Sequence, residues 1–157
     1  MYFFERVKLY AATCYDHKQM RQIREGFQHS DLNMRQVKVY ADPRFDHNQM
    51  EEIRFGFENG LTFEQVKFYS KPDIYYEKMQ QIRFGYKDGL TQEQINTYAD
   101  PKFNHMQMEQ IRLGYINNLA DEEVKFYADL KYQYSQMENI RLAFEEGLTI
   151  QQVSMLA

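Results

Sequence analysis

The sequence repeats itself with a period of 29 residues, and this period restricts the fold more than any other feature. The register is marked by a column of β-branched residues whose first step is 30 residues and whose later steps are 29: Val7, Val37, Val66, Ile95, Val124 and Val153. Three further columns keep the register through five copies: Met20, Met50, Met79, Met108, Met137; Ile23, Ile53, Ile82, Ile111, Ile140; and Arg24, Arg54, Arg83, Arg112, Arg141. Self-similarity at such a period indicates a repeat protein in which each copy is one supersecondary unit.

Each copy begins with the pattern of an amphipathic helix. Met50, Ile53 and Phe57 are spaced i, i+3 and i+7, which places them on one helical face. Asp46 and Gln49 have the spacing of a capping box at the start of that helix. We therefore expect a first helix of about 13 residues in every copy.

A second, shorter helix follows in each copy. Gly60 suits the left-handed position that ends the first helix, and Thr62–Gln65 has the capping-box spacing that begins the next. Phe63, Val66 and Tyr69 are expected to face inward from this second helix. It ends at the Asp-Pro pair of the next copy, because the residue before a proline disfavours the helical region.

These two helices form an αα-hairpin that cannot bury its apolar faces alone. Neighbouring hairpins must therefore stack, as in helical solenoids. We expect an all-α fold of αα-hairpin tandem repeats stacked as a short α-solenoid, forming a single helical-repeat domain over residues 1–157. Residues 1–10 make a half unit and five units of 29–30 residues follow, which predicts eleven helices.

Two further columns predict how the helices approach each other. A column of small residues lies beside the apolar face: Gly26, Gly56, Gly85, Gly114 and Ala143. It allows close backbone approach, and a side chain larger than alanine should clash there. The tyrosine column is interpreted as core packing with a bonded hydroxyl rather than as a stacking platform for bases: Tyr10, Tyr40, Tyr69, Tyr98 and Tyr127.

The arginine column persists while its neighbours on the helix change. Arg54 has a glutamate three residues before it and another four residues after it, whereas Arg24 has Arg21 and Gln28 in those places. The partner must be something that every unit supplies, such as a helix-end carbonyl or a tyrosine hydroxyl, or it lies outside the protein. We favour bracing between helices, which suits a planar group with five donors.

Composition excludes several classes of protein. The 157 residues carry 19 basic and 23 acidic side chains, for a net charge of −4, which argues against a dominant phosphate-binding surface. No stretch approaches the roughly 18 apolar residues of a membrane span, and the first six residues are too few and too acidic for a signal peptide, so we expect a cytoplasmic protein. The single Cys14 cannot form an internal disulfide or a thiolate metal cage.

The repeat also resembles a known group of sequences. The pattern is carried by Tyr98–Phe103, which reads Tyr-Ala-Asp-Pro-Lys-Phe, and by Gln107–Gly114, which reads Gln-Met-Glu-Gln-Ile-Arg-Leu-Gly. It resembles tandem repeats in proteins of conjugative elements and phages of gut Gram-positive bacteria. The resemblance covers nearly the whole chain and implies no catalytic residue. The sequence departs from it in the irregular loops 12–15, 71–76 and 129–134, and residues that determine binding specificity can lie there.

Apolar residues also occur where the helical wheel predicts solvent. On the first helix they are Phe55, Phe84, Leu113 and Leu142, and on the second they include Phe68 and Phe126. One interpretation is that solenoid helices bury two sides against neighbouring units. The other is an exposed apolar ridge that binds a partner, because such patches are uncommon on monomers.

The sequence contains no motif for catalysis or for a cofactor. A nucleophile with a base, a glycine-rich phosphate loop and a zinc helix signature are all missing, so we expect a protein that is not an enzyme and binds no cofactor. Residues that break the repeat are Cys14, His29, Ser30 and Asp31, of which the last three suit an altered turn. His17, His47 and His105 lie in separate copies, and tyrosine replaces histidine in the other two, so we expect no metal site.

Three functions of different class remain open. The leading hypothesis is a binding protein for a protein partner, which the mobile-element resemblance extends to inhibition of a host defence nuclease of CRISPR or restriction type. The second is nucleic-acid binding through a stripe that includes Lys8, Lys38, Lys67 and Lys125. The third is self-association through the terminal half units, at Phe3, Phe4, Met155 and Leu156.

Overall fold

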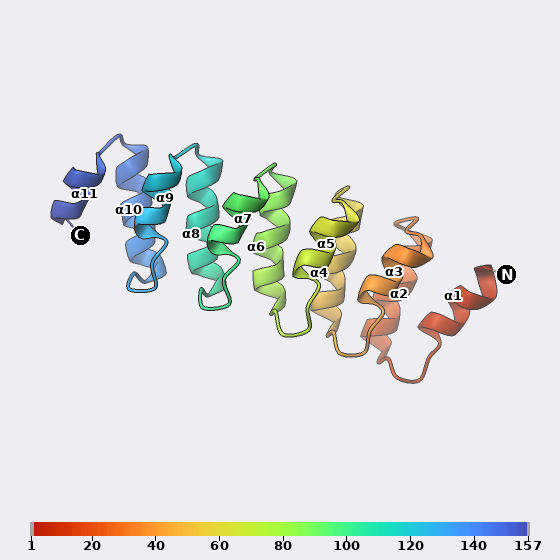
Figure 1. Cartoon of the computed structure of the whole chain (residues 1–157). Helices are drawn as coiled ribbons and strands as arrows, with labels where there is room; N and C mark the ends of the chain where they lie inside the picture. The colour runs from red at the N-terminus through yellow and green to blue at the C-terminus, as the bar shows by residue number, and fades with distance from the viewer. Residues whose placement is uncertain (1, 157) are drawn as a thin grey trace. The chain divides into compact units, whose positions relative to one another are not determined.

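The structure, a computed structural model, describes residues 2–156, with the side chains of Tyr2 and Tyr10 left aside. Over these residues it contains eleven helices and no strand, which confirms the all-α repeat fold (Figure 1). The longer helices have 12 residues each: α2 (His17–Gln28), α4 (His47–Glu58), α6 (Tyr76–Lys87), α8 (His105–Ile116) and α10 (Tyr134–Glu145). The shorter ones are α1 (Tyr2–Tyr10), α3 (Met34–Tyr40), α5 (Phe63–Tyr69), α7 (Gln92–Tyr98), α9 (Asp121–Tyr127) and α11 (Ile150–Leu156).

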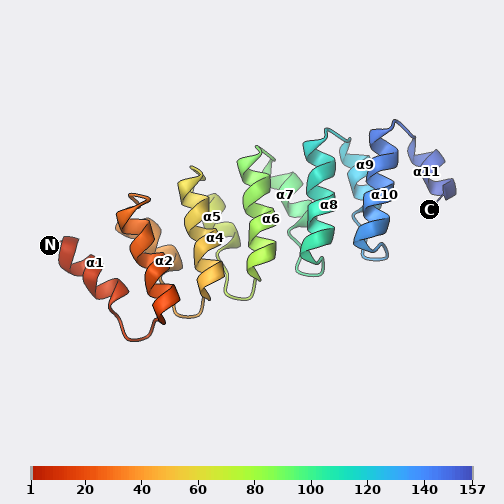
Figure 2. The same ribbon diagram turned by 180° about the vertical axis from the view of Figure 1, so that it is seen from behind.

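The chain divides into two compact units, Met1–Arg83 and Phe84–Ala157, with the boundary inside α6. In the first unit α2 packs beside α4, while α1, α3 and α5 pack against these longer helices (Figure 1). In the second unit α8 packs beside α10, and α7, α9 and α11 pack against them. Each unit therefore has a layer of long helices and a layer of short ones, and Figure 2 shows the long helices in front.

Helix boundaries follow the predicted caps. The carboxylate of Asp46 accepts hydrogen bonds from the backbone N–H groups of Asn48 and Gln49 at 2.8 and 2.9 Å, and the Gln49 side chain accepts one from the Asp46 N–H at 2.9 Å. Gly60 ends this hairpin's first helix with φ +78°, a left-handed conformation that glycine adopts without strain. At the corresponding turns Asp31 and Asn118 take φ values of 51° and 63°, so the turn survives without glycine.

The core is built from the columns that mark the register. The β-branched column is fully buried at Val37, Val66, Ile95 and Val124. The isoleucine and methionine columns of the long helices pack in the same interior, with Ile53, Met79 and Ile111 among the fully buried side chains. Each hairpin thus buries its own apolar face against its neighbours in the unit, which is why the period of the sequence equals the period of the structure.

The small-residue column differs from our prediction in its physical cause. Its close neighbour is a tyrosine side chain and not a backbone, because a Cβ on Gly56 would lie 2.0 Å from the Tyr69 hydroxyl oxygen. That oxygen donates a hydrogen bond to the Glu52 carbonyl at 3.2 Å, which confirms core packing with a bonded hydroxyl. The limit on size is also stricter than predicted, since even alanine would overlap the hydroxyl.

None of the helices within the described residues has the length and hydropathy needed to cross a membrane.

Candidate protein-binding surface

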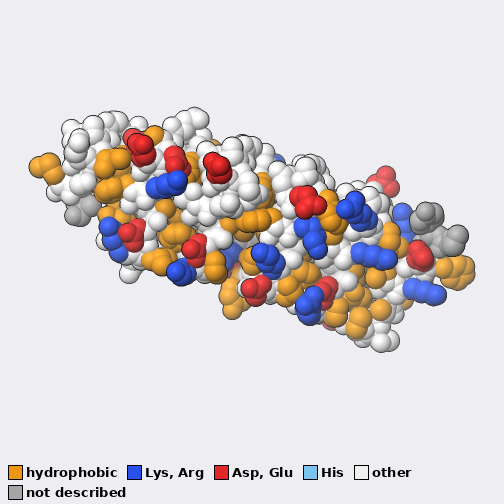
Figure 3. Space-filling model, viewed as in Figure 1, with side chains coloured by type: hydrophobic (Ala, Val, Ile, Leu, Met, Phe, Trp, Pro, Cys, Tyr) orange, Lys and Arg blue, Asp and Glu red, His pale blue; other side chains and the backbone are white. Residues whose placement is uncertain are grey.

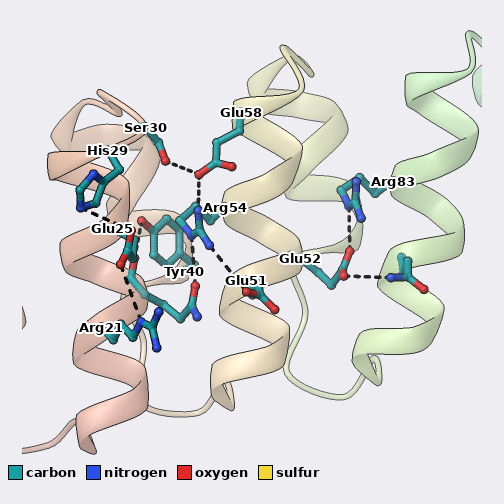
Figure 4. A network of polar contacts seen from close by, with 12 residues as sticks. Arg21, Glu25, His29, Ser30, Tyr40, Glu51, Glu52, Arg54, Glu58 and Arg83 are labelled. Atoms are coloured by element: carbon teal, nitrogen blue, oxygen red, sulfur yellow. Dashed lines mark hydrogen bonds and ion pairs between the residues drawn. The ribbon is translucent and has the colours of Figure 1, made fainter.

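Arginines of the column form hydrogen bonds between successive long helices. In the first unit the Arg54 Nε donates to the Gln22 side-chain oxygen at 3.1 Å, and the Arg83 Nε donates to the Glu52 carboxylate at 2.7 Å (Figure 4). In the second unit the Arg141 Nε donates to the Gln110 side chain at 3.0 Å. These arginines are buried, so the structural interpretation of the column is confirmed.

The partner that every unit supplies was not among those we predicted. It is the residue two positions before the arginine of the preceding long helix. Gln22 accepts from Arg54, Glu52 from Arg83 and Gln110 from Arg141, and all three are buried. The signal was present in the sequence, because a residue with a side-chain carbonyl or carboxyl recurs beside an apolar face where it needs a buried donor. Arg24, in the first copy, is exposed.

Glu52 is an ionic partner for Arg83, whereas Gln22 and Gln110 are neutral partners for Arg54 and Arg141. Its carboxylate accepts from Arg83 and, at 3.3 Å, from the Gln80 amide (Figure 4). Burial raises the pKa of the Glu52 carboxyl above its ordinary value, and the hydrogen bond and charge of Arg83 oppose that rise only in part. The Arg83 Nη1 donates further to the Asn59 side chain at 2.9 Å.

Glutamines at one position of α2, α4 and α8 tie these helices to the loop of the next copy. The Gln49 amide donates to the carbonyls of Pro72 and Ile74 at 3.0 and 2.7 Å. Gln19 makes the same two bonds to Pro43 and Phe45, and Gln107 donates to Tyr132 at 2.9 Å. The glutamines that cap α4 and α8 thus also bond to the irregular loops 71–76 and 129–134.

The predicted apolar ridge is only partly open to solvent. Phe55 is half-buried, with the Arg54 and Arg83 guanidinium carbons 4.8 and 5.4 Å from its ring centre. Phe84 and Leu113 are also half-buried, and the Arg112 guanidinium lies 5.4 Å from the Phe84 ring centre. Leu142 is 42% exposed. Phe55 is therefore half-buried between successive long helices, whereas Leu142 belongs to an exposed ridge.

The short-helix members of the ridge are half-buried. Phe126 packs edge-on against Phe144 with ring centres 5.7 Å apart and stacks on Tyr132 at 6.5 Å. Phe68 lies 5.6 Å from the Lys71 ammonium. These two rings contribute mainly to packing within their own units.

Two of the long-helix surfaces differ in chemistry although they use the same columns. Between α2 and α4 lies a hollow of about 460 Å³ whose lining includes Lys18, Arg21, His47 and Glu51. On α8 and α10 the same columns hold Met106, Glu109, Tyr134 and Glu138. Met106 is 41% exposed and Tyr134 is 45% exposed. We call the surface formed by Met106, Glu109, Leu113, Tyr134, Glu138 and Leu142 the α8–α10 face.

The lysines of the predicted stripe lie on short helices, three of them in the first unit and Lys125 in the second. Lys8, Lys38, Lys67 and Lys125 are all exposed, and the Lys125 ammonium pairs with the Asp121 carboxylate at 2.6 Å. Figure 3, which views the short helices, shows acidic and basic side chains interspersed. A stripe interrupted by carboxylates has a weaker attraction for phosphates than a continuous one.

The remaining candidate positions are surface residues. Phe3, Phe4, Met155 and Leu156 are exposed, and so is Cys14. Ser30 donates a hydrogen bond to the Glu58 carboxylate, which links the altered first turn to the next hairpin (Figure 4). Among the described residues no three His, Cys, Asp or Glu side chains are placed to hold a metal ion.

No family model, curated protein or solved structure matches this chain.

Proposed function

We propose that the chain is a non-enzymatic helical-repeat protein that binds a protein partner through the outer surface of its long helices. The observation that carries this proposal is the contrast between two columns of those helices. The arginine column is the same residue in all five copies and is buried from Arg54 onward. A column on the outer surface differs in every copy: Lys18, Asn48, Glu77, Met106 and Ser135.

This contrast is the pattern of a binding scaffold. The arginines bond to the preceding long helix, the capping glutamines to the next loop and the tyrosine hydroxyls to backbone carbonyls beside the glycines, and these contacts hold the hairpins in register. The outer column makes no such bracing contact, so its residues can vary without loss of the fold. A surface that varies on a constant framework supports recognition of another macromolecule, and the exposed apolar side chains on it support a protein partner.

The resemblance to repeats of mobile-element proteins supports a specific form of this function. In that form the chain acts in the bacterial cytoplasm and inhibits a host defence nuclease of CRISPR or restriction type. A small acidic protein suits this role, because its net charge of −4 complements the basic surfaces with which nucleases hold nucleic acid.

A pull-down from bacterial lysate tests the proposal. Tagged protein is incubated with two halves of one lysate, one of them treated with nuclease, and retained proteins are identified by mass spectrometry. We expect a protein that is retained in both halves. Capture that disappears after nuclease treatment would instead favour the lysine stripe, and replacing Lys38 and Lys67 by glutamine should then abolish it. Absence of any retained protein would contradict the proposal.

A further inference from the structure

We infer that the α8–α10 face binds a basic amphipathic helix of the partner protein. The inference rests on the proposed function and names the surface and the kind of segment that it recognises. Both helices belong to the second unit and pack side by side (Figure 2).

The apolar part of this face consists of side chains that the fold leaves accessible. Met106 is 41%, Tyr134 45% and Leu142 42% exposed. Leu113 is half-buried and lies between Met106 and Ile116 on one face of α8, at i, i+7 and i+10. Methionine and tyrosine on an accessible helix surface adapt to the shape of a bound side chain and give large contact area.

The charge of the second unit selects the sign of the partner. Residues 84–157 hold 6 basic and 11 acidic side chains, whereas residues 1–83 hold 13 basic and 12 acidic. On the α8–α10 face Glu109 and Glu138 precede Leu113 and Leu142 by one helical turn. A segment that places apolar residues on the leucines therefore finds carboxylates beside them, which favours lysine or arginine at its flanks.

The buried groups on these helices are already bonded, so the acidic side chains are the ones left for a partner. Arg141 is held by Gln110 and by Glu145, and Glu145 also accepts from Asn117 at 2.8 Å. Glu138 is exposed and Glu109 is half-buried. Both carboxylates thus add to the surface potential of the face without being needed for the bracing between α8 and α10.

The first unit supplies an internal comparison. In the corresponding columns α2 and α4 hold Lys18 and Asn48 in place of Met106 and Ser135, and Arg21 and Glu51 in place of Glu109 and Glu138. The framework below is the same, but the surface is polar and of mixed charge. Recognition of a basic amphipathic helix is therefore expected at α8–α10 and not at α2–α4.

A peptide-binding assay tests the inference directly. The protein contains no tryptophan, so the emission of a peptide with a single tryptophan reports only the peptide's environment. The probe is a peptide of about 18 residues with leucines and the tryptophan at helical i, i+3, i+4, i+7 spacing and lysines elsewhere. Two further peptides serve as controls, one with the same residues in scrambled order and one with glutamate in place of lysine. We expect saturable blue-shifted emission with the first peptide only, weakening as salt rises.

Matched substitutions locate the binding site. Met106→Ser with Leu142→Ser should weaken binding about tenfold or more, because both remove exposed apolar contact area. Asn48→Ser, in the column of Met106 but on α4, should have no effect. Glu109→Gln with Glu138→Gln should weaken binding and flatten its salt dependence. Glu93→Gln with Glu122→Gln removes the same charge from the layer of short helices and should change the affinity much less.

Several results would overturn the inference. Equal binding of the scrambled peptide would show attraction by net charge alone, and equal loss with the two glutamate pairs would show that the face has no special role. A concentration-dependent doubling of mass that Met106→Ser with Leu142→Ser abolishes would make a second copy of the chain the occupant. If a pull-down retains a protein whose capture these substitutions leave intact, the proposed function stands and this inference fails.

Discussion

The hydroxyl oxygen of Tyr40 lies 1.9 Å from the place that a Cβ atom on Gly26 would occupy. The same hydroxyl donates to the Gln22 carbonyl at 3.3 Å, so the tyrosine is seated directly on the backbone of α2. The fifth copy agrees with this relationship, because it has Ala143 in place of the glycine and Leu156 in place of the tyrosine. Each glycine of the column is therefore explained by the tyrosine thirteen or fourteen residues after it.

Gly26→Ala should destabilise the protein by about 1–3 kcal/mol, because the new methyl group overlaps the tyrosine hydroxyl. In a Tyr40→Phe background the same substitution should be neutral or stabilising, since alanine is favoured over glycine in a helix by about 1 kcal/mol. Urea denaturation of the two single variants and the double variant measures this coupling. Ala143→Gly is the control. It is the reverse substitution, in the copy that has Leu156 in place of the tyrosine, and it should destabilise the protein by about 1 kcal/mol. Additive effects of Gly26→Ala and Tyr40→Phe would contradict the explanation.

Glu52→Gln should stabilise the protein at neutral pH by about 1 kcal/mol, because glutamine accepts from Arg83 without a buried carboxylate. The pKa of Glu52 is raised in the folded protein. The stability that this carboxyl contributes is therefore fully present below its unfolded-state pKa, and is lost as the pH rises through the higher folded-state value. The difference between variant and parent should be largest at neutral pH and should disappear in the acid range.

Denaturation of the Glu52 variant and its parent at several pH values measures this difference. Glu64→Gln, at an exposed position of α5, serves as the control and should leave the stability within about 0.5 kcal/mol of the parent. A variant less stable than the parent at neutral pH would show that the ion pair with Arg83 outweighs the cost of burial.

Gln49→Glu should destabilise the protein by about 1–3 kcal/mol. The carboxylate still caps the Asp46 N–H, but it cannot donate to the carbonyls of Pro72 and Ile74. Gln65→Glu is the matched control, because Gln65 occupies the same capping-box position on α5, where its side-chain oxygen caps the Thr62 N–H. Its effect should stay within about 0.5 kcal/mol. Thermal unfolding of both variants compares them, and equal melting temperatures would show that the bonds to the loop add nothing.

Phe55→Ser and Leu142→Ser should separate the two interpretations of the ridge. Phe55 is half-buried between two guanidinium groups, so its removal should cost about 2–3 kcal/mol. Leu142 is 42% exposed, and its removal should cost less than about 1 kcal/mol. Circular dichroism and urea denaturation give both values. Equal costs would mean that the ridge belongs to the core along its whole length.

The candidate surface was predicted only in part. Leu113 and Leu142 stand out in the sequence because they are apolar at positions that the helical wheel turns outward. Met106 and Tyr134 do not stand out, because a methionine or an aromatic at helical spacing is more often part of a core. Phe55 and Leu142 also occupy one column of the repeat, but they differ in burial. The Arg83 guanidinium of the next helix covers Phe55, whereas Leu142 is exposed.

The linear pattern of residues specifies the hairpin, its caps and its repetition. The capping box of Asp46 with Gln49, the left-handed Gly60 and the buried face through Ile53 all arise from contacts within a few residues, which a linear pattern records. The pairings between helices depend on the tertiary structure, both between copies, as for Arg54 with Gln22, and within one hairpin, as for Gly26 with Tyr40. These depend on which side chains of two separate helices meet, and on how much room the first leaves for the second, so no local spacing specifies them.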